Sequence, residues 1–159
     1  MNDVSFRNVM GKFATGVTVI LVNTKDGYHG MTANAFMSVS LDPALICVSI
    51  DHNASMLEKL KREKQFSVNI LLEDQIDLAR HFAKQQQKST KIEIEEMNAV
   101  PILKNALASI SCRLYDVFKA GDHTLFLGEV DMLQEQEGDP LIFYHGEYSN
   151  VKMKFARQK

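Results

Sequence analysis

Short polar side chains alternate with apolar ones along residues 30–43, GMTANAFMSVSLDP, in a pattern that suits contact with a flat, polar ligand. Thr32, Asn34, Ser38 and Ser40 have apolar residues between them, and this period of two is typical of a half-buried strand. Hydroxyls, an amide and accessible backbone N–H groups are the donors that an acceptor-rich ligand requires. An ordinary antiparallel strand that loosens into a turn at Asp42-Pro43 explains the pattern equally well.

A second candidate lies at residues 53–59, NASMLEK, where a helix is expected to begin. Ser55 and Glu58 have the spacing of a capping box, with Ser55 at the N-cap position. The free N–H groups and positive dipole of a helix start also favour a phosphate group. Simple capping, without a ligand, remains the alternative.

A third candidate is His123, in the stretch AGDHTLF at residues 120–126. It follows a Gly-Asp turn and precedes a long apolar run, so its ring is expected at the end of a sheet. There it can serve as a donor or cation for an anionic or carboxamide-bearing substrate. A solvated turn histidine is the alternative.

Several other chemistries have no support in the sequence. The histidines and the two cysteines, Cys47 and Cys112, have no metal-ligand spacing, and both cysteines lie in apolar surroundings typical of buried, reduced thiols. Neither standard phosphate loop is present, and no nucleophile-elbow motif occurs. The net charge of −2 shows no excess of basic residues of the kind that binds nucleic acid or an anionic membrane.

The elements that must position these residues are mostly short strands. Helices are expected at residues 4–14, from about 56 to 63 and at 75–82, and a mobile loop at 83–90. Strands are expected at 17–22, 28–34, 45–50, 66–71, 100–103, 106–115, 124–133 and 140–144. Short turns join most of them, which favours an antiparallel barrel with attached helices over a doubly wound parallel sheet.

The 159 residues are expected to form one domain, 1–159, that is mainly β with short helices. The first residues lack the apolar core of a signal peptide, and no apolar run reaches the length of a membrane span. A cytoplasmic location is therefore expected.

Several segments, in this order, resemble the short-chain flavin reductase family. Its members are the reductase components of two-component flavin-dependent aromatic monooxygenases, phenol 2-hydroxylase among them. The matching stretches are FRNVMGKFATGVTVI (6–20), HGMTANAFMSVSLDP (29–43), MLEK (56–59), FSVNIL (66–71), AGDHTLFLGEV (120–130) and PLIFYHGEY (140–148). The resemblance implies a split β-barrel of the FMN-binding type, a homodimer, and NADH-dependent reduction of flavin for a separate oxygenase component.

The resemblance also implies which residues bind the cofactors. The flavin ring and ribityl chain would contact Thr32, Ala33, Asn34, Ala35, Phe36, Ser38 and Val39. The flavin phosphate would contact Asn53, Ala54, Ser55, Met56, Leu57, Glu58 and Lys59, with Gln87 and Lys88 closing on the phosphate or adenine side. NADH would contact His123, Tyr144, His145, Gly146, Glu147 and Tyr148.

No catalytic side chain is expected, because hydride transfer between nicotinamide and flavin needs no acid, base or nucleophile from the protein. The cofactor can be FAD or FMN. A non-enzymatic flavin-binding electron carrier on the same barrel is one alternative. A related barrel oxidising pyridoxamine phosphate is another, disfavoured because Lys and Arg are sparse around residues 29–56.

Overall fold

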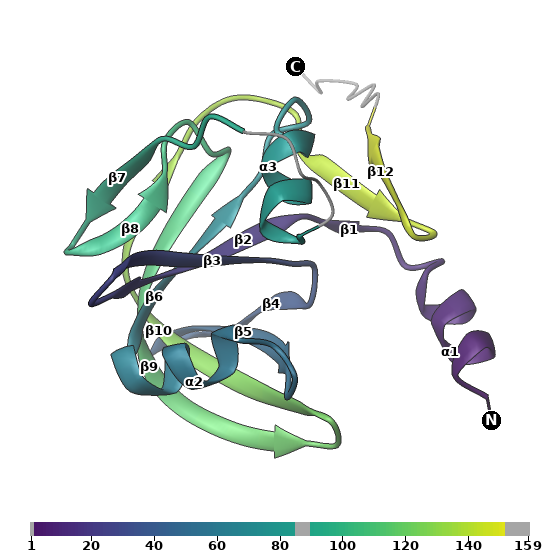
Figure 1. The fold of residues 1–159 in the computed structure, drawn as a ribbon, viewed down its shortest axis with the longest axis horizontal. Helices are drawn as coiled ribbons and strands as arrows, with labels where there is room; N and C mark the ends of the chain where they lie inside the picture. The colour runs from purple at the N-terminus through teal and green to yellow at the C-terminus, as the bar shows by residue number, and fades with distance from the viewer. Residues whose placement is uncertain (1, 85–89, 152–159) are drawn as a thin grey trace.

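The computed structural model describes residues 2–84 and 90–151, which form a mainly antiparallel β structure with three short helices (Figure 1). The helices are α1 (Asp3–Met10), α2 (Met56–Glu63) and α3 (Ile76–Phe82). The strands are β1 (Thr15–Gly16), β2 (Thr18–Thr24), β3 (Gly27–Ala33), β4 (Phe36–Leu41), β5 (Ala44–Asp51), β6 (Gln65–Ile70), β7 (Ile94–Met97), β8 (Val100–Leu103), β9 (Ala108–Ala120), β10 (His123–Glu135), β11 (Leu141–Tyr144) and β12 (Glu147–Asn150).

Seven strands form the main sheet in the order β3-β2-β6-β9-β10-β5-β4. Every pairing in it is antiparallel. The mainly β class with short helices is therefore confirmed. The expected barrel is not, because β3 and β4 are the two outer strands and no ladder joins them within the described residues.

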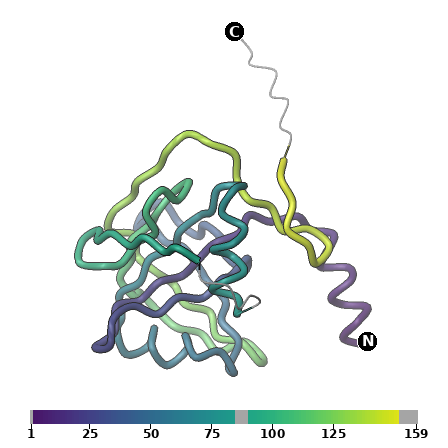
Figure 2. The backbone as a smooth tube through the Cα atoms, turned by 45° about the horizontal axis from the view of Figure 1, so that its top comes forward, coloured from purple at the N-terminus to yellow at the C-terminus, as the bar shows by residue number. Residues whose placement is uncertain are grey.

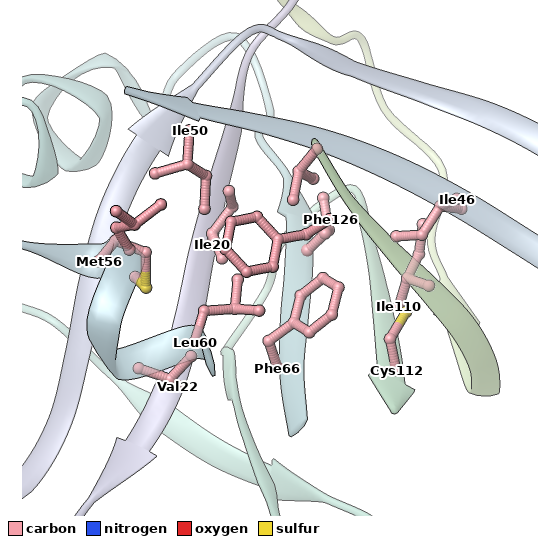
Figure 3. Close-up of a cluster of buried hydrophobic side chains, with 13 residues drawn as sticks. Ile20, Val22, Ile46, Ile50, Met56, Leu60, Phe66, Ile110, Cys112 and Phe126 are labelled. Atoms are coloured by element: carbon pink, nitrogen blue, oxygen red, sulfur yellow. The ribbon is translucent and has the colours of Figure 1, made fainter. Parts of the chain in front are cut away.

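The main core lies between the sheet and α2. Ile20, Ile50, Phe66 and Phe126 come from four different strands and point toward one another (Figure 3). Met56 and Leu60 of α2 enter the same cluster, and both are completely buried. Burial of this apolar face, rather than the helix propensity of eight residues, holds α2 in place.

A second core cluster lies between the sheet and α3. Phe82 of α3 packs on β3 at Gly30, where any Cβ would collide with its ring. The Thr32 hydroxyl donates to the carbonyl oxygen of Ala79 at 2.7 Å. Together these contacts fix α3 on the edge strand β3.

Buried polar groups between β6, β8 and β9 form a closed network around Asn69. Its Nδ2 donates to the Val19 carbonyl (3.0 Å) and to Ser67 Oγ (2.9 Å). Its Oδ1 accepts from the Leu103 N–H and the Ser109 hydroxyl, each at 2.9 Å. Every polar atom of the Asn69 side chain is thus paired, which offsets the cost of burying it.

The two cysteines are free and buried, as expected. Burial raises the pKa of Cys112 to about 12, with a smaller contribution from Asp131. Burial also raises the pKa of Cys47. Both thiols are therefore protonated at neutral pH and unreactive.

Two segments project from the main sheet on the same side, α1 and the β11–β12 hairpin (Figure 2). The predicted helix at 4–14 is too long, because α1 ends at Met10. None of the residues of α1 is buried. Strand β12 was not expected. Most of the loop expected at 83–90 lies outside the described residues. No helix in the described part of the chain is long and apolar enough to span a membrane.

Candidate functional site: a flavin-facing sheet edge

The edge strand β4 presents much of the polar stretch to solvent. Asn34, Ala35, Ser38 and Val39 are exposed. The pairing of β4 with β5 shifts register between Ser38 and Ser40, so Val39 forms a bulge. Because β4 is the last strand of the sheet, its outer edge has no strand partner in the described residues. Backbone donors and acceptors along this edge are therefore available to a ligand.

An apolar cavity of about 300 Å³ adjoins the start of β4. Its lining is shared by the segment that leads into β2 and by the ends of β3, β4 and β6, namely Phe13, Ala14, Thr15, Gly16, Thr18, Asn34, Phe36 and Ile70. The hydroxyl oxygen of Thr15 is buried and has no hydrogen-bond partner in the described part of the chain. An apolar wall with an exposed amide and an unpaired hydroxyl fits a flat ring with polar edge atoms.

Thr32 and Ala33 have structural partners within the protein. The Thr32 hydroxyl is bonded to α3, as described above, and the Ala33 carbonyl accepts from the Thr18 hydroxyl at 2.6 Å. Ala33 and Phe36 also pack against the main core. Of the seven residues expected at the flavin ring, Asn34, Ala35, Ser38 and Val39 are the ones whose side chains are exposed.

The start of α2 is organised differently from the expected capping box. Ser55 occupies the N-cap position, but its side chain makes no cap hydrogen bond, so this prediction is wrong. Ser55 Oγ instead lies 3.1 Å from His29 Nε2 on β3. Its φ of −63° and ψ of −17° are helical, whereas a capping serine has an extended backbone.

The preceding connection is held by Asp51, whose Oδ1 accepts from the Asn53 backbone N–H (2.7 Å) and from Asn53 Nδ2 (3.1 Å). Met56 and Leu57 are buried, so only their backbone groups can contribute to a ligand site. The exposed Glu58 forms an ion pair with Lys61 at 3.2 Å.

Positive charge gathers beside Ser55. Lys59 Nζ donates to the Ser55 carbonyl at 3.3 Å. The pKa of His29 is lowered, first by burial and then by the charges of Lys59 and Lys84. His29 was not predicted as a site residue, although it opens the stretch HGMTANA, because its proximity to Ser55 depends on the packing of α2 against β3.

His123 lies next to the same connection. Its strand β10 pairs with β5 so that His123 stands opposite Asp51, and the His52 N–H donates to the Asp122 carbonyl at 3.0 Å. His123 Nδ1 is 2.7 Å from Asp122 Oδ1, and this contact lowers the pKa of the exposed Asp122 carboxyl. The structure therefore brings His123 close to the start of α2.

The residues expected to contact NADH fall into two separate places. Tyr144, His145, Gly146, Glu147 and Tyr148 lie on the β11–β12 hairpin, which is tied to the end of α1 by the His145 N–H bonded to the Gly11 carbonyl at 2.8 Å. The β9–β10 turn that carries His123 lies near the bottom of both views, apart from this hairpin (Figures 1 and 2). One chain does not bring these two groups together.

A family model described as a flavin reductase like domain matches residues 10–152. The chain belongs to this family. An NADH-dependent flavin reductase from a Rhodococcus species is 38% identical over 150 residues, which cover 92% of this chain and 85% of the relative. The reductase component of 4-hydroxyphenylacetate 3-monooxygenase from Thermus thermophilus is 34% identical over 148 residues, covering 92% and 95%.

Solved structures of flavin reductases have the same fold. Flavin reductase PheA2 in its native state has a TM-score of 0.94 and 51% identity, with 96% of this chain and 100% of that chain covered. The NADH:FAD oxidoreductase SgcE6 from Streptomyces globisporus has a TM-score of 0.86 and 32% identity, covering 96% and 95%. The family resemblance inferred from the motifs is confirmed.

Within this flavin reductase, the remaining site predictions have mixed outcomes. Gln87 and Lys88 lie outside the described residues. No group of three or more His, Cys, Asp or Glu residues in the described segments is placed to hold a metal ion. The sheet edge at Asn34–Val39, the start of α2 and His123 therefore form the candidate site.

Proposed function

We propose that this chain is an NADH-dependent flavin reductase that supplies reduced FAD or FMN to a separate oxygenase acting on an aromatic compound. The observation that carries this proposal is the match of nearly the whole chain to enzymes named as NADH-dependent flavin reductases and as monooxygenase reductase components. Flavin, when bound, would supply the acceptor, at N5, for the hydride from C4 of the nicotinamide. The chain's own residues then have to bind and orient the two rings.

The flavin ring is proposed to lie against the outer edge of β4 and the apolar cavity beside it. Asn34, the unpaired Thr15 hydroxyl and the bulge at Val39 provide polar contacts around an apolar wall. Backbone N–H groups near Ala33–Ala35 would stabilise the negative charge that develops on the ring as it is reduced. The flavin phosphate would bind at Asn53–Ser55, beside Lys59 and His29.

Nicotinamide nucleotide is proposed to bind at His123 and at the β11–β12 hairpin. Because these groups lie apart in one chain, the proposal requires that the hairpin of a second copy reaches the site. The projection of α1 and the hairpin from the sheet suits such an exchange between two-fold related chains (Figure 2).

A homodimer also accounts for the exposed apolar residues of α1 and of the segment that follows it. Phe6, Val9 and Phe13 are 52%, 65% and 73% exposed. An eight-residue helix with no buried residue is marginal in water, and a large apolar patch usually marks an interface. A second copy that covers these residues would stabilise both arms. A split barrel is proposed with it, supported by the likeness of the fold to flavin reductases of known structure, and a cytoplasmic location is proposed as well.

Sedimentation of the purified chain tests the dimer. The 18.0 kDa chain is expected at twice its mass, and the double variant Phe6→Ser, Val9→Ser at the monomer mass. The control variant Lys12→Ser changes a polar residue next to α1 and should leave the dimer intact. A wild-type monomer at micromolar concentration would contradict the proposal.

Catalytic oxidation of NADH tests the function. With excess FAD or FMN, the nicotinamide absorbance should fall over many turnovers, and anaerobically the flavin should bleach with it. A non-enzymatic flavin carrier would bind flavin without consuming NADH. Flavin binding without any NADH-dependent bleaching would therefore contradict the reductase function and favour a non-enzymatic flavin carrier.

A further inference from the structure

His52 lies between the two ligand positions proposed above. The ladder between β5 and β10 ends at the pair Asp51 and His123, and His52 is the first residue beyond it. From His52 the chain continues to residues 53–55, the proposed position of the flavin phosphate. On its other side lies the β9–β10 turn, which carries His123. His52 is therefore the one residue that adjoins both positions at the end of this ladder.

The contacts of His52 hold the residues on both sides of His123. The backbone N–H of His52 donates to the Asp122 carbonyl at 3.0 Å. Its ring Nε2 lies 3.1 Å from Thr124 Oγ1. Thr124 is only 4% exposed, so its hydroxyl is a fixed partner for the ring. The pKa of Asp122 is lowered first by His123 and to a smaller extent by the charge of His52.

The β9–β10 turn depends on such contacts because it is exposed. Gly121 and Asp122 at its tip are open to solvent. The His123 ring is bonded to Asp122, which is itself exposed, so this contact does not tie the turn to the core. Exposed turns with few buried contacts move easily. A ligand that binds at a moving His123 must also restrict that motion, which weakens binding.

The flavin side of the connection is held separately by Asp51. Its Oδ1 accepts from the Asn53 N–H (2.7 Å) and from Asn53 Nδ2 (3.1 Å), and its carbonyl accepts from the Ala54 N–H at 3.0 Å. None of these bonds uses the His52 ring. Loss of the ring should therefore loosen the β9–β10 turn and leave residues 53–55 in place.

We propose that His52 is a positioning residue for NADH, whose ring, bonded to Thr124, keeps the turn in place and holds His123 where nicotinamide nucleotide binds. The inference rests on the proposed flavin reductase function and deepens it. His52 needs no contact with the reacting atoms, because its effect passes through the backbone of Asp122 to His123.

Steady-state kinetics of the purified full chain, at saturating FAD and FMN in turn, test this inference. His52→Ala is expected to raise the KM for NADH about 3-fold, with kcat and the dissociation constant of flavin within about 2-fold of the wild type. Thr124→Val removes the partner hydroxyl with little change in volume and should have the same effect. His52→Gln keeps a polar group that can bond to Thr124 and should restore the wild-type KM.

The matched control is Thr24→Val. It removes a hydrogen bond that holds another turn, from the Thr24 hydroxyl to the Gly27 carbonyl at 2.9 Å across the β2–β3 connection. Its KM for NADH should equal that of the wild type. An unchanged KM in His52→Ala or Thr124→Val, or equal weakening of flavin and NADH, overturns the inference.

A double variant shows whether His52 acts through His123. In the His123→Ala background, His52→Ala should raise the KM for NADH by less than about 1.5-fold, because the group that it positions is already absent. Independent effects would multiply to a rise of about 15-fold over the wild type, and that result would contradict a positioning role.

Nitrogen-15 relaxation of the ligand-free chain reads the position of His123 without turnover. The order parameter of the His123 amide is expected near 0.85 in the wild type and in Thr24→Val, and to fall toward about 0.6 in His52→Ala. An unchanged order parameter in His52→Ala overturns the inference. Failure of the wild type to oxidise NADH with either flavin contradicts the reductase function instead, so the two failures are distinguishable.

Discussion

Asn69 and Asn34 both lie in stretches where small polar residues alternate with apolar ones, yet their environments are opposite. Asn69 is completely buried, and four hydrogen bonds satisfy its amide. Asn34 is exposed at the sheet edge, and its side chain has no hydrogen-bond partner in the described residues. A polar group whose partners are all in the protein stabilises the fold, whereas one left open is available to a ligand.

The largest expected effect is the loss of stability when the buried network is broken. Asn69→Ala leaves the Leu103 N–H and other buried groups without partners, and we expect it to lower the free energy of unfolding by about 3 kcal/mol. Asn34→Ala, at the exposed position, should change it by less than about 0.5 kcal/mol. Chemical denaturation of both variants measures their free energies of unfolding. Equal losses for Asn69→Ala and Asn34→Ala would contradict the contrast between the two positions.

The next effect is on flavin affinity. Here the larger loss is expected at the exposed Asn34, whereas the larger loss of stability is expected at the buried Asn69. Asn34→Asp replaces an amide donor with a negative charge beside the proposed flavin ring, and we expect flavin to bind about 10-fold more weakly. Fluorescence titration at a temperature where the variant is fully folded measures this. Asn23→Asp, at the far end of β2, is a matched control. An unchanged dissociation constant for Asn34→Asp would exclude Asn34 from the site.

His123→Ala extends the comparison to the second ligand. Among the described residues, the side chain of His123 is paired with the exposed Asp122 alone, so its loss should hardly affect folding. We expect the KM for NADH to rise about 5-fold, because one donor or positive charge is lost, while the dissociation constant of flavin stays within 2-fold. Steady-state kinetics at saturating flavin give the first value. Equal losses of flavin and NADH affinity would count against the assignment.

The smallest expected effect concerns His29, which is partnered by Ser55 but also lines a cavity. Burial, Lys59 on α2 and Lys84 after α3 lower its pKa below its ordinary value of 6.5. The other titratable groups that line the cavity with it are Tyr28, His81 and Lys84. The unfolded chain therefore binds the proton more tightly, so stability is present above that value and is lost as pH falls through the folded-state pKa.

The wild type should consequently lose more thermal stability between about pH 7 and pH 5 than His29→Gln does. Thermal unfolding at both pH values measures this difference. His145→Asn removes an exposed histidine from the β11–β12 turn and is the control. If the two histidine variants keep the full pH dependence of the wild type, His29 does not contribute to it.

Local sequence patterns were sufficient for most strands and for the family. Val17 to Val22 is a β-branched run and Leu45 to Ile50 is a nearly continuous apolar run, and they correspond to the largely buried strands β2 and β5. The environment of each polar residue could not be predicted in this way. Thr32 bonds to Ala79, 47 residues away, and Ser55 contacts His29, 26 residues away. Such partners depend on how α2 and α3 pack on β3, which no local period encodes.

The exposed stripe of α1 shows the same limit. Phe6, Val9 and Phe13 have the spacing of a buried helix face, and the prediction of a helix was correct in type but too long. What covers that face is a question of assembly, which spacing along one chain does not answer. The separation of His123 from the β11–β12 hairpin likewise follows from tertiary placement.

Amide hydrogen exchange with and without flavin tests most directly the claim that the outer edge of β4 faces the flavin. Exchange should slow on flavin binding at residues 34–39 and at the start of α2, while the backbone around Asn69, already protected by β2 and β9, stays unchanged. The measurement is made at a protein concentration where the oligomeric state is the same with and without flavin. Protection elsewhere, with none at residues 34–39, would contradict the account.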